Sequence, residues 1–565
     1  MMRILLVAIN AKYIHSNPAV FSLKACAGEY ESYVDVAEYT INQQSSYILR
    51  EIYKKRPDVV AFSCYIWNRS MIAEIISDLH KIMPNIDLWA GGPEVSYDAL
   101  DVIKEWGLKG VMSGCGEGSF YHLVSAYVHG TSANLPTVLD GNQTYRFYLD
   151  DIPFWYQNIE DFEHRIIYYE SSSGCPFSCS YCLSSIDKTM DFRSLEQVYQ
   201  DLNYFIQHNV VQVKFIDRTF NCKKDHALPI LQYIAEHDNG ITNFHFEIAA
   251  DLLDEDYFVL LEKMRPGAVQ FEIGVQSTHY ETISEINRRM DFHKVTDAVR
   301  RISAWNNIHI HLDLIAGLPY EDIETFHKSF DDVYELAPEQ LQLGFLKVLK
   351  GSAMEAHAAE YGLVYTSMPP YEVLSTKWLS YEDVCHLKQI EEVLEIYYNS
   401  GQFRNTLKYL CDFFNNPYDL YDRLTSWYEE YELFGIQSSR IKKYDILMEF
   451  GEAWIRNHMP SERLILLLRE YLTYDLYLRE HMKNRPSFAL SLENRKDDIY
   501  NILYKESQDH LMFPELSGYS YRELTKALHV EIFENIFEQP AIVVFCYDRR
   551  DPLTNNCIVT KVKIF

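Results

Sequence analysis

The chain has 565 residues, of which 47% are hydrophobic, and this is enough for about three packed domains. Its formal net charge is −29, so it lacks the overall basic surplus with which proteins grip polynucleotides, and nucleic acid is disfavoured as a partner. The apolar runs are far shorter than the about 20 residues that a membrane span requires, so we expect no membrane insertion.

The first apolar stretch, Ile4–Ile9, predicts a buried strand, because it is too short for a signal-peptide core and no cleavage pattern follows it. Because no export signal or membrane span is recognised, we expect a cytoplasmic protein. A disulfide framework is then unlikely for the eleven cysteines, which are also an odd number. Eight of them are scattered and are interpreted mainly as small buried side chains: Cys26, Cys64, Cys115, Cys222, Cys385, Cys411, Cys546 and Cys557.

Strands alternate with helical patterns over residues 1–130. Between the third and fourth strands, apolar residues from Met71 to Ile82 recur with the period of a helix, which Pro84 closes. The alternation predicts a doubly wound parallel sheet, whose ligands bind at the carboxyl ends of the strands. The expected strands are Ile4–Ile9, Val34–Ala37, Asp58–Ser63, Ile86–Ala90 and Gly110–Ser113.

Small residues follow three of these strand ends. Ser63 ends the third strand, Gly91-Gly92-Pro93 follows the fourth, and Gly114-Cys115-Gly116-Glu117-Gly118 follows the fifth. Glycine lets a backbone approach a ligand closely, although the same residues also suit plain turns. No GxGxxG sequence follows the first strand, which argues against a dinucleotide.

This series resembles the cobalamin-binding domain that precedes many radical SAM enzymes. The resemblance implies a Rossmann-like cobalamin-binding domain over residues 1–137. It assigns cobalamin contacts to Ser63, Gly91, Gly92, Gly114 and Glu117. The Asp-x-His-x-x-Gly motif that supplies a lower axial histidine in other cobalamin proteins is absent, and His15 stands in a different context.

Three further cysteines stand together, as Cys175-x-x-x-Cys179-x-x-Cys182, after a strand expected at Ile166–Ser171. Thiolates bind zinc or iron–sulfur clusters. Structural zinc prefers four ligands, whereas a [4Fe–4S] cluster on three thiolates leaves one iron open to a small molecule. A zinc site completed by a distant ligand stays as the alternative.

The spacing, with Tyr181 before the last cysteine, resembles the radical SAM superfamily closely. The resemblance implies a partial (β/α)6 barrel over residues 160–375, in which S-adenosylmethionine (SAM) binds the open iron and is cleaved reductively to a 5′-deoxyadenosyl radical. Helices are expected at Leu195–Ile206, Asp254–Met264 and His293–Trp305. The remaining barrel strands are expected at Val211–Asp217, Asn243–Ala249, Ala268–Gly274, Ile308–Ile315 and Leu341–Val348.

Family motifs at the strand ends imply the SAM contacts. Glu247 and Arg288 would meet the amino acid end of SAM, where a carboxylate suits the ammonium and a guanidinium suits the carboxylate. Gln276 and Asp313 would hold the ribose hydroxyls, and Gly317 would let the backbone approach the adenine.

One position departs from the family. Ala249 stands where many relatives have an arginine, so Arg289 is an alternative to Arg288. The carboxylates of Asp217, Glu247 and Asp313, taken singly, could also be solvated strand-end groups.

Residues 376–565 predict a mainly helical domain that ends in a β-hairpin, Ala541–Tyr547 and Cys557–Ile564. The region resembles an uncharacterised accessory domain of bacterial cobalamin-dependent radical SAM proteins. It holds no further cysteine set, so a second cluster is not expected. Its helices are expected at Phe403–Phe414, Leu420–Phe434 and Ser461–Met482.

The leading hypothesis is a cobalamin-dependent radical SAM enzyme that binds a [4Fe–4S] cluster, SAM and cobalamin. It would transfer a methyl group to an unactivated centre of a small-molecule or peptide substrate, with an electron donor such as flavodoxin or ferredoxin. Three alternatives stay open: a cyclase, rearrangement or reductase reaction that uses cobalamin without methylation; a non-catalytic cobalamin or redox sensor; and an enzyme that acts on RNA.

Overall fold

The computed structural model describes residues 2–186 and 188–563, so Ile564 of the expected hairpin lies outside the described residues. The chain forms two compact units. The first unit comprises Met1–Ile308, Ile315–Asp322 and Phe345–Tyr381, and the second comprises His309–Leu314, Ile323–Gly344 and Glu382–Phe565. Within the described part of the chain, no helix has both the length and the apolar character to cross a membrane.

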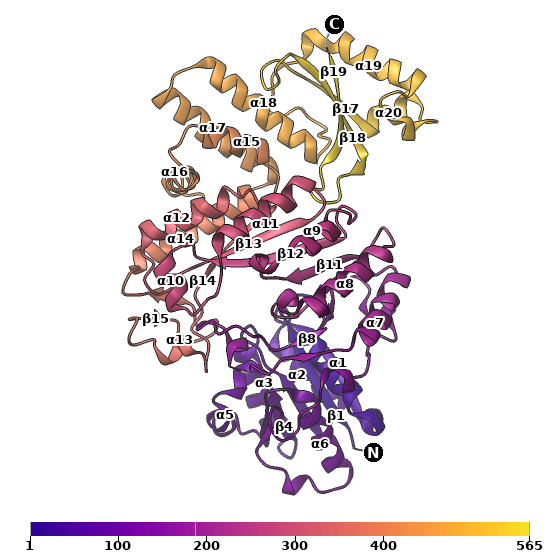
Figure 1. Cartoon of the computed structure of the whole chain (residues 1–565), viewed down its shortest axis with the longest axis vertical. Coiled ribbons are helices and arrows are strands. Elements are labelled where there is room, and N and C mark those ends of the chain that lie inside the picture. Colours follow the sequence, from indigo (N-terminus) through magenta and orange to yellow (C-terminus); the bar gives the residue numbers. More distant parts are fainter. Residues whose placement is uncertain (1, 187, 564–565) are drawn as a thin grey trace. The chain divides into compact units, whose positions relative to one another are not determined.

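The first unit begins with a parallel sheet, of which β1 and β4 are labelled in Figure 1. Its strand order is β2-β1-β3-β4-β5-β6. All seven residues of β1 are buried, because a strand lies on each side of it and helices cover both faces. The chain reverses its direction of winding between β1 and β3, and such a switch point is where a ligand crevice opens. The strands are β1 (Ile4–Asn10), β2 (Val34–Thr40), β3 (Val59–Ser63), β4 (Asp87–Gly91), β5 (Gly110–Ser113) and β6 (Val138–Asp140).

The helices of this sheet follow the apolar periodicity of the sequence. In α3, Ile72, Ile75, Ile76 and Leu79 form one fully buried face. The helices are α1 (Pro18–Cys26), α2 (Ser45–Lys55), α3 (Arg69–Ile82), α4 (Pro93–Ser96), α5 (Ala99–Trp106) and α6 (Gly116–Val128). The doubly wound fold expected for this region is confirmed, and β6 is an additional strand that the sequence did not predict.

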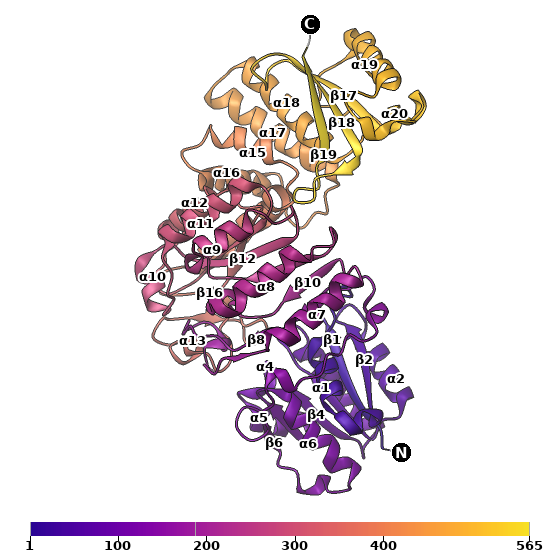
Figure 2. The same cartoon turned by 45° about the vertical axis from the view of Figure 1, so that its right-hand side comes forward.

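A second set of strands alternates with helices along the chain, which is the succession expected for a (β/α)6 barrel. Within the first unit these strands pair parallel in the order β12-β11-β10-β7. Helices α7, α8 and α9 pack side by side along them (Figure 2). The strands are β7 (Ile167–Tyr169), β10 (Gln212–Phe215), β11 (Asn243–Glu247), β12 (Val269–Gln276), β13 (His309–Ala316) and β14 (Gln340–Phe345).

Of the helices between these strands, α7, α9 and α11 correspond to the three that were expected, and α8, α10 and α12 are additional. They are α7 (Leu195–Gln207), α8 (Lys224–Glu236), α9 (Glu255–Leu261), α10 (Tyr280–Glu285), α11 (Phe292–Trp305) and α12 (Ile323–Tyr334). Short segments complete the region: α13 (Ala353–Ala356) and the two-stranded pairs β8 (Ser172–Ser173) with β9 (Asp191–Phe192) and β15 (Val364–Tyr365) with β16 (Val373–Ser375).

The two parallel sheets of the first unit meet at β7. The residue before this strand, Ile166, forms a parallel bridge with His15, and its N–H donates to the carbonyl of Ile14 at 2.9 Å. His15 Nδ1 also lies 2.6 Å from the hydroxyl of Tyr168. His15 is therefore a structural residue of this junction, and burial lowers its pKa.

The second unit contains a helical region and a three-stranded antiparallel sheet in the order β17-β18-β19. The expected hairpin is present as β18 (Ala541–Arg550) and β19 (Cys557–Lys563), and β17 (Leu528–Phe533) is a third strand that the sequence did not predict. The buried carboxylate of Asp475 accepts hydrogen bonds from the N–H and hydroxyl of Thr406, which joins α18 to α15. The helices are α14 (Tyr381–Leu394), α15 (Arg404–Cys411), α16 (Pro417–Glu430), α17 (Arg440–His458), α18 (Glu462–Arg479), α19 (Lys496–Asp509) and α20 (Tyr521–Ala527).

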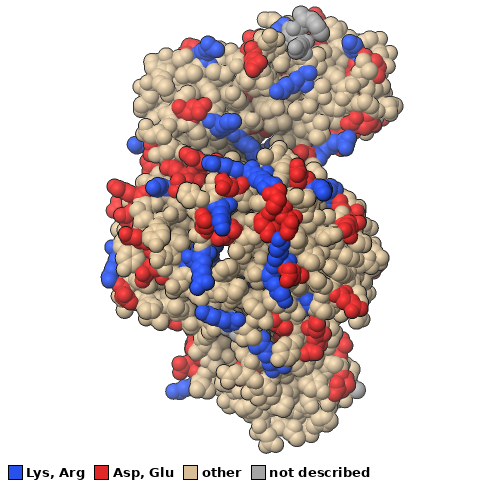
Figure 3. Space-filling model, viewed as in Figure 1, with Lys and Arg blue, Asp and Glu red and all other residues tan. Residues whose placement is uncertain are grey.

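Basic and acidic side chains are interspersed on the face shown in Figure 3. Many cations of the first unit are paired, as in Arg301 with Glu255 at 2.7 Å and Arg265 with Asp238 at 2.7 Å. Paired cations have less charge to offer to phosphates.

Candidate functional site

A cavity of about 330 Å³ opens at the carboxyl ends of β3, β4 and β5, beside the switch point of the first sheet. The five residues to which the sequence assigned cobalamin contacts all line it: Ser63, Gly91, Gly92, Gly114 and Glu117. They belong to three separate segments at the carboxyl ends of β3, β4 and β5, so the fold brings together residues that lie up to 54 positions apart in the sequence.

Two of these glycines occupy positions that only glycine fits. Gly92 has φ +107°, and a Cβ there would lie 2.4 Å from the carbonyl oxygen of Cys64. Gly114 has φ +75°, and a Cβ there would lie 2.5 Å from Oδ1 of Asn142. The loops are therefore packed against neighbouring backbone and side chains, which fixes the wall of the cavity.

Hydrogen bonds hold the remaining loop residues in place. Glu117 accepts from the hydroxyl of Ser22 at 2.8 Å. Asn142, which sequence reasoning missed, accepts from the N–H of Cys115 at 3.0 Å. Its place two residues after β6 could have been a signal, but β6 itself was not predicted.

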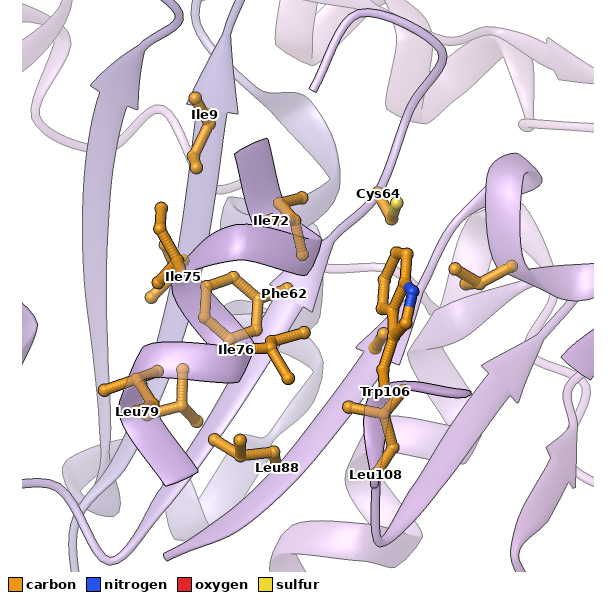
Figure 4. Packing of buried hydrophobic residues seen from close by; sticks show 14 of the residues in the cluster. Ile9, Phe62, Cys64, Ile72, Ile75, Ile76, Leu79, Leu88, Trp106 and Leu108 are labelled. Carbon is orange, nitrogen blue, oxygen red and sulfur yellow. The ribbon is translucent and has the colours of Figure 1, made fainter. Parts of the chain in front are cut away.

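Cys64 belongs to the hydrophobic core rather than to the cavity wall. It is fully buried beside Trp106, in the cluster that contains Phe62 and Ile72 (Figure 4). Burial raises the pKa of its thiol well above the usual range, so a thiolate at this position is disfavoured.

The cavity also contains a residue from the second set of strands. Arg218, three residues beyond the end of β10, lines it together with Tyr65 of the loop after β3. The Arg218 side chain is exposed and has no ion-pair partner among the described residues. Sequence reasoning missed Arg218, although it directly follows Asp217, which was considered as a strand-end carboxylate.

Glu170 is, after Glu117, a second carboxylate close to Arg218. It follows the last residue of β7, and burial together with the nearby Asp217 and Glu117 raises its pKa to about 7, against the opposing charge of Arg218. The sequence placed Glu170 inside a predicted strand and gave no reason to single it out.

The cluster loop, residues 174–182, begins directly after β8, which itself follows β7. Gly174 has φ +89°, and a Cβ there would lie 2.3 Å from the carbonyl oxygen of Thr189, so the loop turns tightly against another segment. All three cysteines of the loop are free thiols, with Cys179 buried and Cys175 and Cys182 half-buried.

The carboxylate of Asp217 holds Ser171 and Ser172, the residues that lead into this loop, by hydrogen bonds. Its fully buried carboxylate accepts from the Ser171 N–H at 2.9 Å, the Ser171 hydroxyl at 2.6 Å and the Ser172 hydroxyl at 2.7 Å. Burial raises its pKa to about 6 against these hydrogen bonds. Asp217 is thus a buried, hydrogen-bonded group and not a solvated strand end.

The far end of the loop is tied to the residues after β12. The Ser180 N–H donates to Ile286 O at 2.9 Å. Arg288 Nη1 lies 3.2 Å from the hydroxyl of Tyr181 and 3.9 Å from Cys179 Sγ, and its Nη2 donates to Gly274 O. Arg289 is exposed, so of the two arginines only Arg288 meets the cluster loop in this way.

Glu247 and Gln276 are the last residues of β11 and β12, at the same end of neighbouring strands. Gln276 has φ +74°. Ala249, at the position that departs from the family, is held through its backbone by both amide atoms of Asn221, at 2.9 and 2.8 Å.

Gly317 has φ +91°, and a Cβ there would lie 2.7 Å from Cγ1 of Val373, so glycine is required at this position too. Asp313 lies on β13 in a segment of the second unit, where its carboxylate is 3.0 Å from His311 Nε2.

Gln276 Oε1 and Arg288 Nε are among the buried polar atoms of this site that have no hydrogen-bond partner among the described residues. Buried polar atoms are normally paired, so such atoms mark a place where a ligand can bind. Three free thiols within one loop, two unpartnered polar atoms nearby and a glycine-walled cavity fit a cluster, SAM and cobalamin respectively.

Three family matches cover most of the chain. Residues 4–124 match the family described as B12 binding domain, and residues 169–333 match the family described as Radical SAM superfamily. Residues 359–545 match a family described as a protein of unknown function, DUF4080.

Characterised relatives are distant. The chain is 23% identical over 354 residues to a cobalamin-dependent radical SAM methyltransferase, TokK, of Streptomyces tokunonensis, a match that covers 54% of this chain and 50% of TokK. It is 25% identical over 299 residues to the hopanoid C-3 methylase of Methylococcus capsulatus, covering 49% and 56%. The chain therefore spans about half the length of these relatives.

Solved structures share the fold. The chain superimposes with a TM-score of 0.53 and 18% identity on TsrM, a radical SAM methyltransferase of Kitasatospora setae solved with tryptophan and a SAM analogue, over 65% of this chain and 78% of TsrM. The cobalamin-dependent SAM radical enzyme OxsB, solved with aquacobalamin, gives a TM-score of 0.53 at 13% identity, over 84% and 80%. At these identities the likeness concerns the fold.

Proposed function

We propose that this chain, a radical SAM superfamily protein with a B12-binding domain, is a cobalamin-dependent enzyme that transfers a methyl group from SAM to an unactivated centre of its substrate. One observation carries the proposal. Arg218, which follows Asp217 at the end of β10, lines the glycine-walled cavity of the B12-binding domain, while Asp217 fastens the strand that leads into the cluster loop. One substrate placed at this junction can thus face both cofactor sites.

Each residue has a role in the proposal. Cys175, Cys179 and Cys182 hold the cluster, and Ser63, Gly91, Gly92, Gly114 and Glu117 surround cobalamin. Glu247, Gln276, Arg288, Asp313 and Gly317 bind SAM. When bound, the cluster and SAM supply a radical that abstracts hydrogen, and cobalamin supplies a transferable methyl group.

The protein's own groups orient the reactants. Arg288 places a cation beside Tyr181 and Cys179, where it can meet the carboxylate of SAM. Arg218 is free to receive an anionic group of the substrate, and Glu170, with its pKa of about 7, can hold or release a proton next to it.

The remaining features of the proposal concern the whole protein. The domains comprise residues 1–137, 160–375 and 376–565, and the enzyme works in the cytoplasm with an electron donor such as flavodoxin or ferredoxin. The substrate is a small molecule or a peptide.

The test has two stages. Protein is purified anaerobically from cells supplied with cobalamin, and its iron, sulfide and cobalt are measured. It is then incubated with reductant, a small-molecule and peptide extract of its own cells, and SAM with a deuterated methyl group. We expect 5′-deoxyadenosine, S-adenosylhomocysteine and one deuterium-labelled product.

The outcomes separate the alternatives. Iron without cobalt would exclude methyl transfer through cobalamin. 5′-Deoxyadenosine without S-adenosylhomocysteine would instead indicate a cyclisation, rearrangement or reduction. Bound cofactors without any SAM cleavage would favour a sensor. In the same assay, Arg218→Ala should retain both metals yet lose the labelled product.

A further inference from the structure

Residues 346–373, here called the linking segment, belong to the first unit and follow β14. Within this segment, Gly351 lies against the ring of Tyr97, and a Cβ at Gly351 would be 2.4 Å from Cδ1 of that ring. Tyr97 lines the cavity of the first sheet. Three residues further along the segment, the N–H of Met354 donates to the carbonyl of Ser180 in the cluster loop at 2.9 Å. The linking segment thus reaches from the cobalamin cavity to the cluster loop.

A buried carboxylate ties a later part of the linking segment to the same cavity wall. Glu94 directly follows Pro93, which lines the cavity, and it accepts a hydrogen bond from the hydroxyl of Tyr371 at 2.9 Å. Burial raises the pKa of Glu94, and the hydrogen bond from Tyr371 opposes this shift. Because a buried carboxylate that loses its donor is costly, the cavity wall and the linking segment favour being in place together.

An ion pair adds to these contacts. The half-buried carboxylate of Asp98 pairs with Lys350 of the linking segment and lies 3.7 Å from Arg69 of α3. Residues 94–98, which follow β4, are therefore joined to the linking segment in three ways: by a hydrogen bond, by a ring contact and by an ion pair.

The linking segment also packs against residues expected to bind SAM. Val373 lies in β16, and its Cγ1 would be 2.7 Å from a Cβ at Gly317. The N–H of Val373 donates to Leu346 O, and the N–H of Leu346 donates to Ala316 O, each at 2.9 Å. Val373 also shares a hydrophobic cluster with Tyr181 of the cluster loop. Displacing the segment would therefore disturb Gly317 and the cluster loop together.

We propose that the linking segment couples the two cofactor sites, so that cobalamin tightens the binding of SAM, and SAM tightens the binding of cobalamin by the same factor. Tyr371 is a positioning residue in this coupling, because it holds Glu94 at the cavity wall while its own segment packs on Gly317. Cobalamin fixes the cavity wall, the wall fixes the segment, and a segment already in place leaves less to be ordered when SAM binds.

The inference rests on the cofactor sites of the proposed function, but not on methyl transfer. Its test uses the full chain, purified anaerobically with its cluster from cells grown without cobalamin. Equilibrium dialysis without reductant measures the affinity for labelled SAM, first alone and then with saturating hydroxocobalamin. The affinity for hydroxocobalamin is measured with and without SAM. We expect each cofactor to tighten the binding of the other about fivefold or more, by equal factors.

A matched pair of variants assigns the coupling to the linking segment. Tyr371→Phe removes the donor to Glu94 and should lower the coupling factor about threefold or more. Tyr365→Phe makes the same change in the same segment, at a residue that packs against the cluster of Val373, and should leave the factor unchanged.

A second variant separates coupling from folding. Tyr371→Phe alone leaves the buried Glu94 without this donor, whereas Tyr371→Phe combined with Glu94→Met removes both polar partners, which costs less stability. The double variant should fold and should show the same lowered coupling factor.

Three results would overturn the inference. Binding of both cofactors without coupling would do so and would leave the proposed function standing. An unchanged coupling factor in both Tyr371 variants would mean that the cofactors influence each other directly or through other residues. Failure of the cluster-loaded chain to bind either cofactor would overturn the inference together with the proposed function.

Discussion

Arg288 lies 3.2 Å from the hydroxyl of Tyr181 through its Nη1, and the same atom is 3.9 Å from Cys179 Sγ. A residue 109 positions beyond Cys179 thus reaches the cluster loop, while its Nε is buried without a partner among the described residues. Both Nη atoms of Arg288 thus contact protein groups, and its Nε–H is left to donate to a ligand.

Arg288→Met should therefore weaken SAM binding by about 10- to 100-fold, because a hydrogen bond to a charged group contributes about 1.5–3 kcal/mol. Equilibrium dialysis with labelled SAM measures this, and the iron content should stay at the wild-type level. Arg289→Met is the matched control and should bind SAM normally. The reverse pattern would assign the role to Arg289.

Cys179→Ala should lose the cluster and all SAM cleavage, measured as iron content and 5′-deoxyadenosine. Cys222→Ala is the informative control. Burial raises the pKa of the Cys222 thiol to about 11, and the nearby Cys175 adds to this shift, so Cys222 is another thiol close to the loop. We expect this variant to keep its cluster. Loss of iron from it would mean four thiolate ligands and no open iron.

Gly92→Ala should abolish cobalamin retention. The positive φ alone costs about 1–3 kcal/mol, and the contact of the new Cβ with Cys64 O, at 2.4 Å, adds an overpacking cost of about 1–3 kcal/mol. Gly130→Ala is the control, since its φ is +70° but nothing lies within 4 Å of its Cβ position. Cobalt content and thermal unfolding should separate the two. Equal cobalt loss in both variants would contradict the argument.

Glu170→Gln should change the pH dependence of stability. The pKa of Glu170 is raised from 4.5 to about 7 by burial, Asp217 and Glu117, with Arg218 opposing, so the folded protein binds a proton that the unfolded chain releases. The stability this confers is present below about pH 4.5 and is lost as the pH rises through 7.

The glutamine stays neutral, so the variant should be more stable than the wild type by about 1–3 kcal/mol at pH 8 and equal to it at pH 4. Unfolding midpoints across this range measure the difference. The exposed Glu160→Gln should track the wild type throughout. A pH-independent difference for Glu170→Gln would show that its environment is not the cause.

Local patterns account for part of this candidate site, and long-range contacts account for the rest. The cysteine spacing and the glycine-rich strand ends are local, and the cavity of the first sheet contains all five residues taken from them. Arg218 and Asn142 could not be found in this way, because their importance comes from loops far away in the sequence.

Strand β17 was missed for a related reason. Leu528–Phe533 directly follows α20, and its partner β18 begins only at Ala541. The loop between them is held by Glu470, whose buried carboxylate accepts from the N–H groups of Glu534, Asn535 and Ile536 at 2.8–3.1 Å. Glu470 lies in α18, more than 60 residues before this loop, so the residues next to it in the sequence give no indication of the contact.

The junction at β7 bears on how the two cofactor regions can be separated. β7 has only three residues, and its neighbour on the side away from β10 is the segment around His15. Arg165, just before the strand, also meets Glu38 of the B12-binding domain at 2.5 Å. A fragment cut between the two domains would remove this neighbour of β7, close to the cluster loop. Loss of the first domain would therefore remove both the segment around His15 that borders β7 and the cavity of the first sheet.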